Sequence, residues 1–302
     1  MSLLAYDFMQ RALIGALITG LAAPALGIYL VQRRMALIGD GIGHVALTGV
    51  GLGLLTSRSP VFMAIVVASL GAVAVELIRE RGKASGDIAL ALLFYGGISG
   101  GVFLVALSDG KTNANLTAYL FGSPLTTSRE DLFVMAVLGG VVLTVALLLR
   151  PWLFAICQDE EYARVAGLPV RALNLLLAVT TAVTVTVAMR AVGLLLVSAM
   201  MVVPVAAAQL VTRGFRATMH LAMALGLLAA GAGIAVAGQY DTAPGATIVL
   251  VAIALFAGLA GGSAVWRFAL RRSRAARPGV AAGRRTGPSE PDVEPPDVVL
   301  QG

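Results

Sequence analysis

Long apolar segments separated by short polar links make up most of this 302-residue chain. A helix needs about 20 mostly apolar residues to cross the hydrocarbon core of a bilayer. Nine segments come near that length: residues 12–32, 35–56, 60–79, 86–107, 131–150, 171–189, 191–211, 219–238 and 245–266. The segment 191–211 is the weakest, because Pro204 and the very short link at Arg190 allow a broken or partly re-entrant helix. The pattern therefore predicts an all-α, polytopic transmembrane helical bundle of eight to nine spans.

Composition agrees with this fold class. Hydrophobic residues make up 58% of the chain and charged residues 13%, and the mean hydropathy is +0.90, whereas a soluble domain carries about 25% charged residues. The 35 glycines suit helices that pack closely in lipid. The alternating ten-residue pattern of an outer-membrane barrel is not found in the sequence.

The distribution of basic residues predicts the orientation. With the amino terminus outside, ten of the 22 Lys and Arg residues fall in inner loops and seven follow Trp266, which leaves five outside. This split obeys the positive-inside rule, so we expect a multi-pass protein of the inner (plasma) membrane with a cytoplasmic carboxyl terminus. Residues 1–270 form the predicted transmembrane domain. Residues 271–302, rich in Arg and Pro, are predicted to be a disordered cytoplasmic tail.

Two ionisable residues in the second apolar segment are the main clue to function. Asp40 and His44 are four residues apart, and on a helix such residues project from one face. Ionisable groups in hydrocarbon are costly and tend to mark pathways, partners or ions. A carboxylate and an imidazole suit zinc and, with more oxygen ligands, manganese. Two copies of the chain meeting across a twofold axis would supply four such ligands.

A purely structural interpretation of this pair remains open at this point. Asp40 would cap the start of a helix entered through Gly39, and His44 would bond a neighbouring carbonyl group. The glycines of the same segment would let another backbone approach closely, as in ordinary helix contacts.

The inner connection of residues 151–170 is a second candidate. It concentrates charge on a short amphipathic helix that ends at Gly167-Leu168-Pro169. With Asp159, Glu160, Glu161 and Arg164 exposed, this helix would rest on a soluble partner; the alternative is a solvated connection. The other long connection, residues 108–130, is predicted to be outside, with a short surface helix around residues 117–124.

Several functional classes find no support. Gly110-Lys111-Thr112 lacks the earlier glycine of a phosphate-binding loop and the strand that precedes one. The two histidines do not form a zinc-protease motif, and no base is evident near Ser198 or Thr180, so the chain is not expected to be an enzyme. Its basic residues suit a cytoplasmic membrane face better than nucleic acid. The single cysteine, Cys157, excludes an internal disulfide.

Several motifs in order resemble a known family, the integral membrane permeases of ABC importers for zinc and manganese (the ZnuB and MntB type). The resemblance covers most of residues 8–266. Its motifs are Arg11-Ala12-Leu13, residues 33–44 with Asp40 and His44, Asp159 through Pro169, Gly193 through Pro204, and Pro244 through Ile248. The chain departs from the family in having Gly43 where a serine often precedes the histidine.

The resemblance implies a transport subunit that alternates access across the membrane. It implies a homodimer or paired permease subunits, two cytoplasmic ATPase subunits that bind the ATP, and an extracytoplasmic metal-binding protein. It places Asp40 and His44 on the route of the transported zinc or manganese, with no permanently bound cofactor. It assigns ATPase coupling to Asp159, Glu160, Glu161, Tyr162, Ala163, Arg164 and Gly167.

Three rival functions remain. The first is an ABC permease for a metal chelate such as a siderophore or cobalamin. The second is an ATP-independent metal carrier or channel, and the third is an enzyme or a membrane scaffold.

Overall fold

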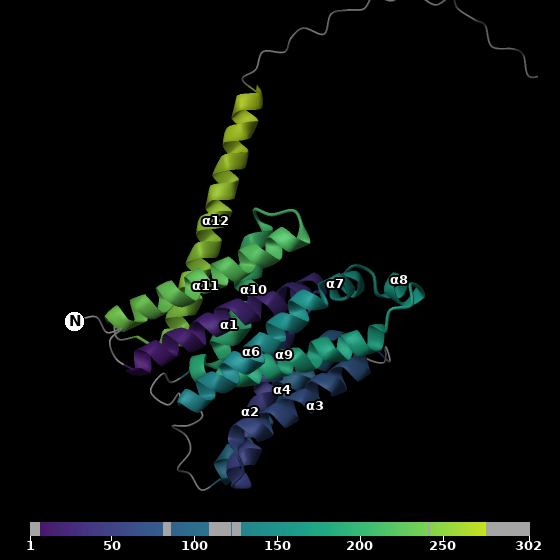
Figure 1. Cartoon of the computed structure of the whole chain (residues 1–302), viewed down its shortest axis with the longest axis vertical. Coiled ribbons are helices and arrows are strands. Elements are labelled where there is room, and N and C mark those ends of the chain that lie inside the picture. Colours follow the sequence, from purple (N-terminus) through teal and green to yellow (C-terminus); the bar gives the residue numbers. More distant parts are fainter. Residues whose placement is uncertain (1–6, 81–85, 109–121, 123–127, 241, 276–302) are drawn as a thin grey trace, which may run out of the picture. The chain divides into compact units, whose positions relative to one another are not determined.

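The computed structural model describes residues 7–80, 86–108, 122, 128–240 and 242–275 (Figure 1). Within these residues the chain is helical and contains no strand. The helices are α1 (Asp7–Gln32), α2 (Ile38–Leu55), α3 (Pro60–Glu80), α4 (Gly86–Leu107), α6 (Arg129–Leu148), α7 (Arg150–Gln158), α8 (Glu160–Val165), α9 (Val170–Val192), α10 (Leu194–Gln209), α11 (Phe215–Tyr240) and α12 (Pro244–Ala275). The prediction of an all-α membrane bundle is confirmed.

The predicted spans match the observed helices closely. Eight helices are long and apolar enough to cross a membrane: α1, α2, α3, α4, α6, α9, α11 and α12. The segment predicted at 191–211 forms α10, which has only 16 residues and is therefore about 24 Å long at 1.5 Å per residue. The predicted surface helix around residues 117–124 lies almost wholly outside the described residues.

Local sequence signals set the helix ends. Ser128 begins α6 with a capping box, in which its hydroxyl accepts from the amide of Asp131 and the Asp131 carboxylate accepts from the amide of Ser128. Pro60 and Pro244 are the first residues of α3 and α12, where the missing amide hydrogen costs nothing. Gly193, at φ +88°, separates α9 from α10.

The chain divides into a unit of residues 1–263 and a unit of residues 264–302. In the first unit, α1, α2, α9 and α10 are buried along most of their length, and α4, α6 and the first part of α12 face outward along most of theirs. Figure 1 shows α2, α3 and α4 grouped together, and α1 packs against α6, α10 and α11. In the second unit the described residues continue α12 as far as Ala275, beyond the boundary predicted at residue 270.

One end of the bundle gathers basic residues, and we call it the basic end. Arg33 and Arg79 lie there against Glu160 of α8, and Phe215 at the start of α11 packs on Phe154 of α7. At the opposite end Asp7 and Arg129 approach at the starts of α1 and α6. The sequence placed Arg33, Arg79 and Glu160 on the inner side together, and the structure gathers them at one end.

The short helix α10 connects the two ends. It begins after Gly193, beside Gly122 of the α4–α6 connection, and leads to Phe215 at the basic end. Its sides are covered by α1, α2, α9 and α11. A helix shorter than the roughly 30 Å hydrocarbon core is tolerated here, because the neighbouring helices cover most of its length.

Glycine-mediated contact between α1 and α11 generates the first prediction. A Cβ at Gly226 would meet the backbone and Pro24 of α1, whereas a Cβ at Gly231 on the same helix meets nothing within 4 Å. Gly226→Ala should therefore separate two helix backbones and lower the thermal unfolding temperature of the purified protein in detergent. Gly231→Ala should keep or raise that temperature, because alanine favours helix over glycine by about 1 kcal/mol. Equal unfolding temperatures for the two variants would contradict this packing.

Candidate functional site

The polypeptide enters α2 through a tight turn at the end of α1. The Met35 amide donates to the Leu30 carbonyl at 2.9 Å, and the Arg34 amide donates to the Val31 carbonyl at 3.1 Å. Arg34 adopts φ +58°. This pair of bonds and the left-handed residue define a Schellman motif, which fixes the start of α2 relative to the end of α1.

Asp40 is not a helix cap. The residue that caps α2 is Leu37, which makes no side-chain capping bond, and Asp40 is the third residue of the helix. His44 follows one turn later and is buried. The structural interpretation left open by the sequence, in which Asp40 caps the helix, is therefore wrong.

The two side chains face each other without forming a strong bond. His44 Nε2 lies 3.8 Å from Asp40 Oδ1, which is beyond hydrogen-bond distance. His44 Nδ1 is buried and has no hydrogen-bond partner among the described residues. The other structural interpretation, a bond from His44 to a carbonyl group, is thus not supported at Nδ1. A buried polar atom without a protein partner is rare, and it leaves Nδ1 available to a ligand.

Glycines of α2 place this pair deep in the bundle. A Cβ at Gly39 would lie 3.0 Å from the sulfur of Met201, and a Cβ at Gly43 would overlap the side chain of Leu194. Both glycines also face Val185 of α9. Asp40 and His44 therefore lie at the level of Val185. This level is between the end of the bundle that holds the α1–α2 turn and the end that holds Gly193.

Ser198 of α10 is a site residue that the sequence analysis missed. Its hydroxyl donates to Asp40 Oδ1 at 3.3 Å and also lies 3.4 Å from the Leu194 carbonyl. The sequence suggested no partner for Ser198, which lies far from Asp40 along the chain. The Ser198 hydroxyl of α10 lies beside the Asp40 carboxylate. A serine at position 43, where relatives often have one, would collide with Leu194.

A pocket of about 340 Å³ opens next to Asp40 between α2 and α4. Leu37, Leu90, Phe94 and Tyr95 supply most of its apolar lining. The Phe94 ring meets the imidazole of His44 edge to face, with a centroid distance of 4.5 Å, which helps to fix the orientation of the imidazole ring. One quarter of the Asp40 side chain is exposed, against 11% for His44, so the carboxylate is the accessible member of the pair.

One chain supplies an incomplete set of metal ligands. Among the residues that the structure describes, no group of three or more His, Cys, Asp or Glu side chains comes together. Asp40, His44 and the Ser198 hydroxyl would thus leave a divalent cation with open positions. Such a site can bind an ion and release it, whereas a structural zinc site is closed by four protein ligands.

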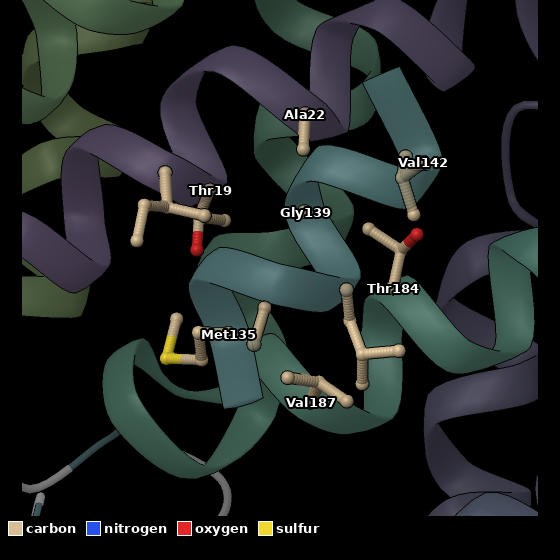
Figure 2. A pocket seen from close by; sticks show the side chains of 10 residues that line it. Thr19, Ala22, Met135, Gly139, Val142, Thr184 and Val187 are labelled. Carbon is tan, nitrogen blue, oxygen red and sulfur yellow. The ribbon is translucent and has the colours of Figure 1, made fainter. Parts of the chain in front are cut away.

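A second, smaller pocket lies between α1, α6 and α9, and it is a packing gap. Figure 2 shows Thr19, Met135, Val142, Thr184 and Val187 around a space of about 20 Å³. The hydroxyls of Thr19 and Thr184 already donate to the carbonyls of Gly15 and Thr180 in their own helices. No polar group is left to bind a ligand there.

The inner connection of residues 151–170 forms α7 and α8 at the basic end, and the predicted coupling segment, Asp159 through Pro169, contains α8. Asp159 caps α8 by accepting from the Tyr162 amide at 2.9 Å. The helix ends as predicted at Gly167, which has φ +81° in a second Schellman motif. Tyr162, Arg164 and Glu161 face outward, and Ala163 is buried.

Glu160 differs from its neighbours in this segment. The sequence suggested that it is exposed, but its carboxylate turns toward Arg33, Arg79 and Asn174. The coupling segment therefore has an outer face that is available to a partner and an inner face that is tied to the bundle.

Residues 5–260 match the family described as ABC-3, the ABC 3 transport family. The chain is 34% identical over 84% of its length to the manganese transport system membrane protein MntC of Halalkalibacterium halodurans, covering 87% of that protein. It is 28% identical to the high-affinity zinc uptake system membrane protein ZnuB of Haemophilus influenzae, with 83% of this chain and 96% of that protein covered.

A solved structure shares the fold. The structure of PsaBC from Streptococcus pneumoniae in complex with Fab superposes with a TM-score of 0.76 and 29% sequence identity. The match covers 85% of this chain and 92% of the other.

The single cysteine provides a prediction for the basic end. The Cys157 thiol lies in α7, 3.7 Å from the Tyr29 carbonyl of α1. Burial raises the pKa of Cys157 from 9.0 to about 11. The positive charge of Arg33 lowers this pKa, and the negative charge of Glu160 raises it. Because the thiolate is the reactive form, a rise of two pKa units reduces it about 100-fold at pH 8. Maleimide should therefore label native Cys157 about 100-fold more slowly than the denatured protein, with a rate that still rises up to pH 10. Labelling at the rate of an exposed thiol would show that α7 does not pack on α1.

Proposed function

We propose that this chain, which belongs to the ABC 3 transport family, is the membrane permease subunit of an ATP-driven importer of a divalent metal ion, manganese or zinc. The observation that carries the proposal is the pair of Asp40 and the buried His44, whose Nε2 lies 3.8 Å from the carboxylate, beside a pocket that opens between α2 and α4. Relatives named for manganese and for zinc transport support the same class of cargo. In this proposal the metal is the substrate, and ATP is hydrolysed by separate subunits.

The chemistry of the site suits transit better than storage. Asp40 contributes negative charge and oxygen, His44 contributes nitrogen, and Ser198 contributes a neutral oxygen or holds the carboxylate in place. A transported ion must bind tightly enough to enter and weakly enough to leave. Few ligands on separate helices meet both needs, because a small displacement of α2 from α10 would separate Asp40 from Ser198.

A second copy of the chain completes the proposed site. The α2–α4 pocket is bordered by the exposed apolar side chains of Leu37 and Tyr95, a surface suited to contact with protein or lipid. A twofold-related copy placed on this face would bring a second Asp40 and a second His44 to the same space. Two carboxylates and two imidazoles would then replace much of the hydration shell of the ion.

The proposed partners follow from the two ends of the bundle. By the positive-inside rule, the basic end faces the cytoplasm of a cell whose inner (plasma) membrane holds the protein, with the amino terminus outside. The outer face of α8, with Tyr162 and Val165 exposed, would contact the ATPase subunits. An extracytoplasmic metal-binding protein would deliver the ion at the opposite end, and access would alternate between the two sides.

The carboxylate of the site is the first target. Asp40→Asn keeps the shape of the side chain but removes its charge, so metal uptake by vesicles that contain the whole transporter should fall at least about 100-fold, the upper end of the usual effect of losing a supporting residue. Radioactive manganese and zinc, each in competition with the other, are the two cargoes to measure. Co-purification of the ATPase should stay unchanged, because Asp40 is remote from α8.

Two further variants serve as controls for this experiment, and a metal chelate is tested as an alternative substrate. Asp7→Asn removes a carboxylate at the opposite end and should leave uptake unaltered. Ser198→Ala should raise the metal concentration for half-maximal uptake by about 10-fold, as expected for a supporting hydroxyl. Parental uptake rates in Asp40→Asn would refute the site. Uptake of a metal chelate but not of free metal, or uptake without the ATPase, would support a rival function.

Mixed pairs test whether two copies share the site. A parental copy and an Asp40→Asn copy with different tags can be co-expressed, and the mixed pairs purified through both tags. If the ion needs both carboxylates, mixed pairs should transport metal at the low rate of pure Asp40→Asn pairs. Transport at half the parental rate or more would mean that each chain works alone, and failure to recover doubly tagged complexes would refute the homodimer.

A further inference from the structure

Glu160 is the centre of an ion-pair network at the basic end. Its Oε2 accepts from Arg33 at 3.1 Å and from Arg79 at 3.3 Å, and its Oε1 accepts from Asn174 of α9 at 3.3 Å. Arg79 also binds Glu76 through two nitrogens, at 3.0 and 2.6 Å. A single residue of α8 thus bonds to the end of α1, to α3 and to α9.

The network is buried and balanced in charge. The side chains of Arg33 and Glu76 are each 6% exposed, and two guanidinium groups face the two carboxylates of Glu76 and Glu160. Arg164 adds a weaker contact at 3.6 Å, with 65% of its side chain exposed. Because the carboxylates are neutralised by arginines, this cluster is not a second cation site. Its role is mechanical.

The network is connected to the helix that carries the proposed metal site. Arg33 directly precedes the left-handed residue of the Schellman turn, and the Ile38 amide at the start of α2 donates to Met35 of that turn. Only seven positions separate Arg33 from Asp40. A turn held by two backbone bonds passes a displacement of its first residue to the helix that follows instead of absorbing it.

A small cavity lies between the network and α2. It measures about 10 Å³ and is lined by Arg33, Glu76 and Asn174 on one side and by Ile38 and Ile42 of α2 on the other. Asn174 Oδ1 is buried there without a partner. This space leaves the first turns of α2 room to follow a small movement of Arg33, whereas the rest of α2 is closely packed against α3 and α4 through Gly49 and Gly51.

We infer that Glu160 is a positioning residue whose network couples movement of the α7–α8 segment to the position of Asp40 and His44. This inference rests on the proposed function and assigns a task to one residue of the coupling segment. Residues on the outer face of α8 would contact the ATPase. Glu160 would transfer the resulting movement through Arg33 to α2 and through Arg79 to α3, on which α2 packs.

The test measures coupling in the full transporter with its ATPase and binding protein. In Glu160→Gln, stimulation of ATP hydrolysis by the metal-loaded binding protein should fall by at least about fivefold, the lower range of ordinary coupling between sites. The number of ATP molecules hydrolysed per metal ion imported should rise correspondingly. Glu80→Gln is the matched control. Glu80 lies next to Arg79 at the end of α3 and, like Glu160, pairs with an arginine: its carboxylate is 3.2 Å from Arg171 of α9, but this pair is more exposed. It should behave like the parental protein.

A double variant separates coupling from simple stability. Glu160→Gln alone leaves Arg33 buried without its counter-charge, which destabilises the fold. Arg33→Gln combined with Glu160→Gln removes both charges, so it should recover the unfolding temperature but not the coupling. Recovery of coupling in the double variant, or normal coupling in Glu160→Gln, would overturn the inference while leaving parental metal uptake intact. Absence of metal uptake by the parental transporter would instead overturn the proposed function and this inference with it.

Discussion

Close contact between helix backbones is the constraint on which the rest of the structure depends. Gly39 and Gly43 on α2 leave room for Met201 and Leu194 of α10, while Gly97 of α4 lies against the backbone of His44 and Val45. Without these contacts Ser198 would not reach Asp40, and Phe94 would not reach His44. In lipid, where the hydrophobic effect does not drive helices together, small residues and packing have this role. The geometry of the site thus depends on the positions of glycines, which have no side chain to keep the helices apart.

The two groups of ionisable residues in the bundle are built on opposite principles. At the basic end every carboxylate of the network has a guanidinium partner, so the group is electrically neutral and can remain closed. Among the described residues, Asp40 faces a hydroxyl and a more distant imidazole nitrogen but no guanidinium or ammonium group, so its carboxylate is not neutralised by a basic side chain. A buried network that satisfies itself holds helices together, whereas a buried pair that does not satisfy itself attracts an ion.

Hydropathy and length were sufficient to predict the long helices, because a spanning segment is selected by its own composition. The segment 86–107 matches α4 at both ends, and Gly167 ends α8 as the Gly-Leu-Pro signal indicated. Pairings between distant helices were not predictable in the same way. Ser198 meets Asp40, and Glu160 meets Arg33, only because α10 and α8 fold against α1 and α2. A hydroxyl in an apolar helix and a glutamate in a charged loop carry no local signal of such partners.

The conformation described by the structure is itself informative about the order of events in transport. Asp40 is accessible from the α2–α4 pocket. Toward the basic end, Ile38 and Ile42 of α2 line a separate cavity together with Arg33. The cavity on that side, about 10 Å³, is no larger than about one water molecule. A divalent cation moving in that direction would meet apolar side chains and then two positive charges. If the ion is released toward the basic end, as we propose, Arg33 and Arg79 would have to move, and the residue that holds both of them is Glu160 of α8. On that proposal the contacts that fix α8 would also block the ion, so displacement of α8 and opening of the pathway would be one event rather than two.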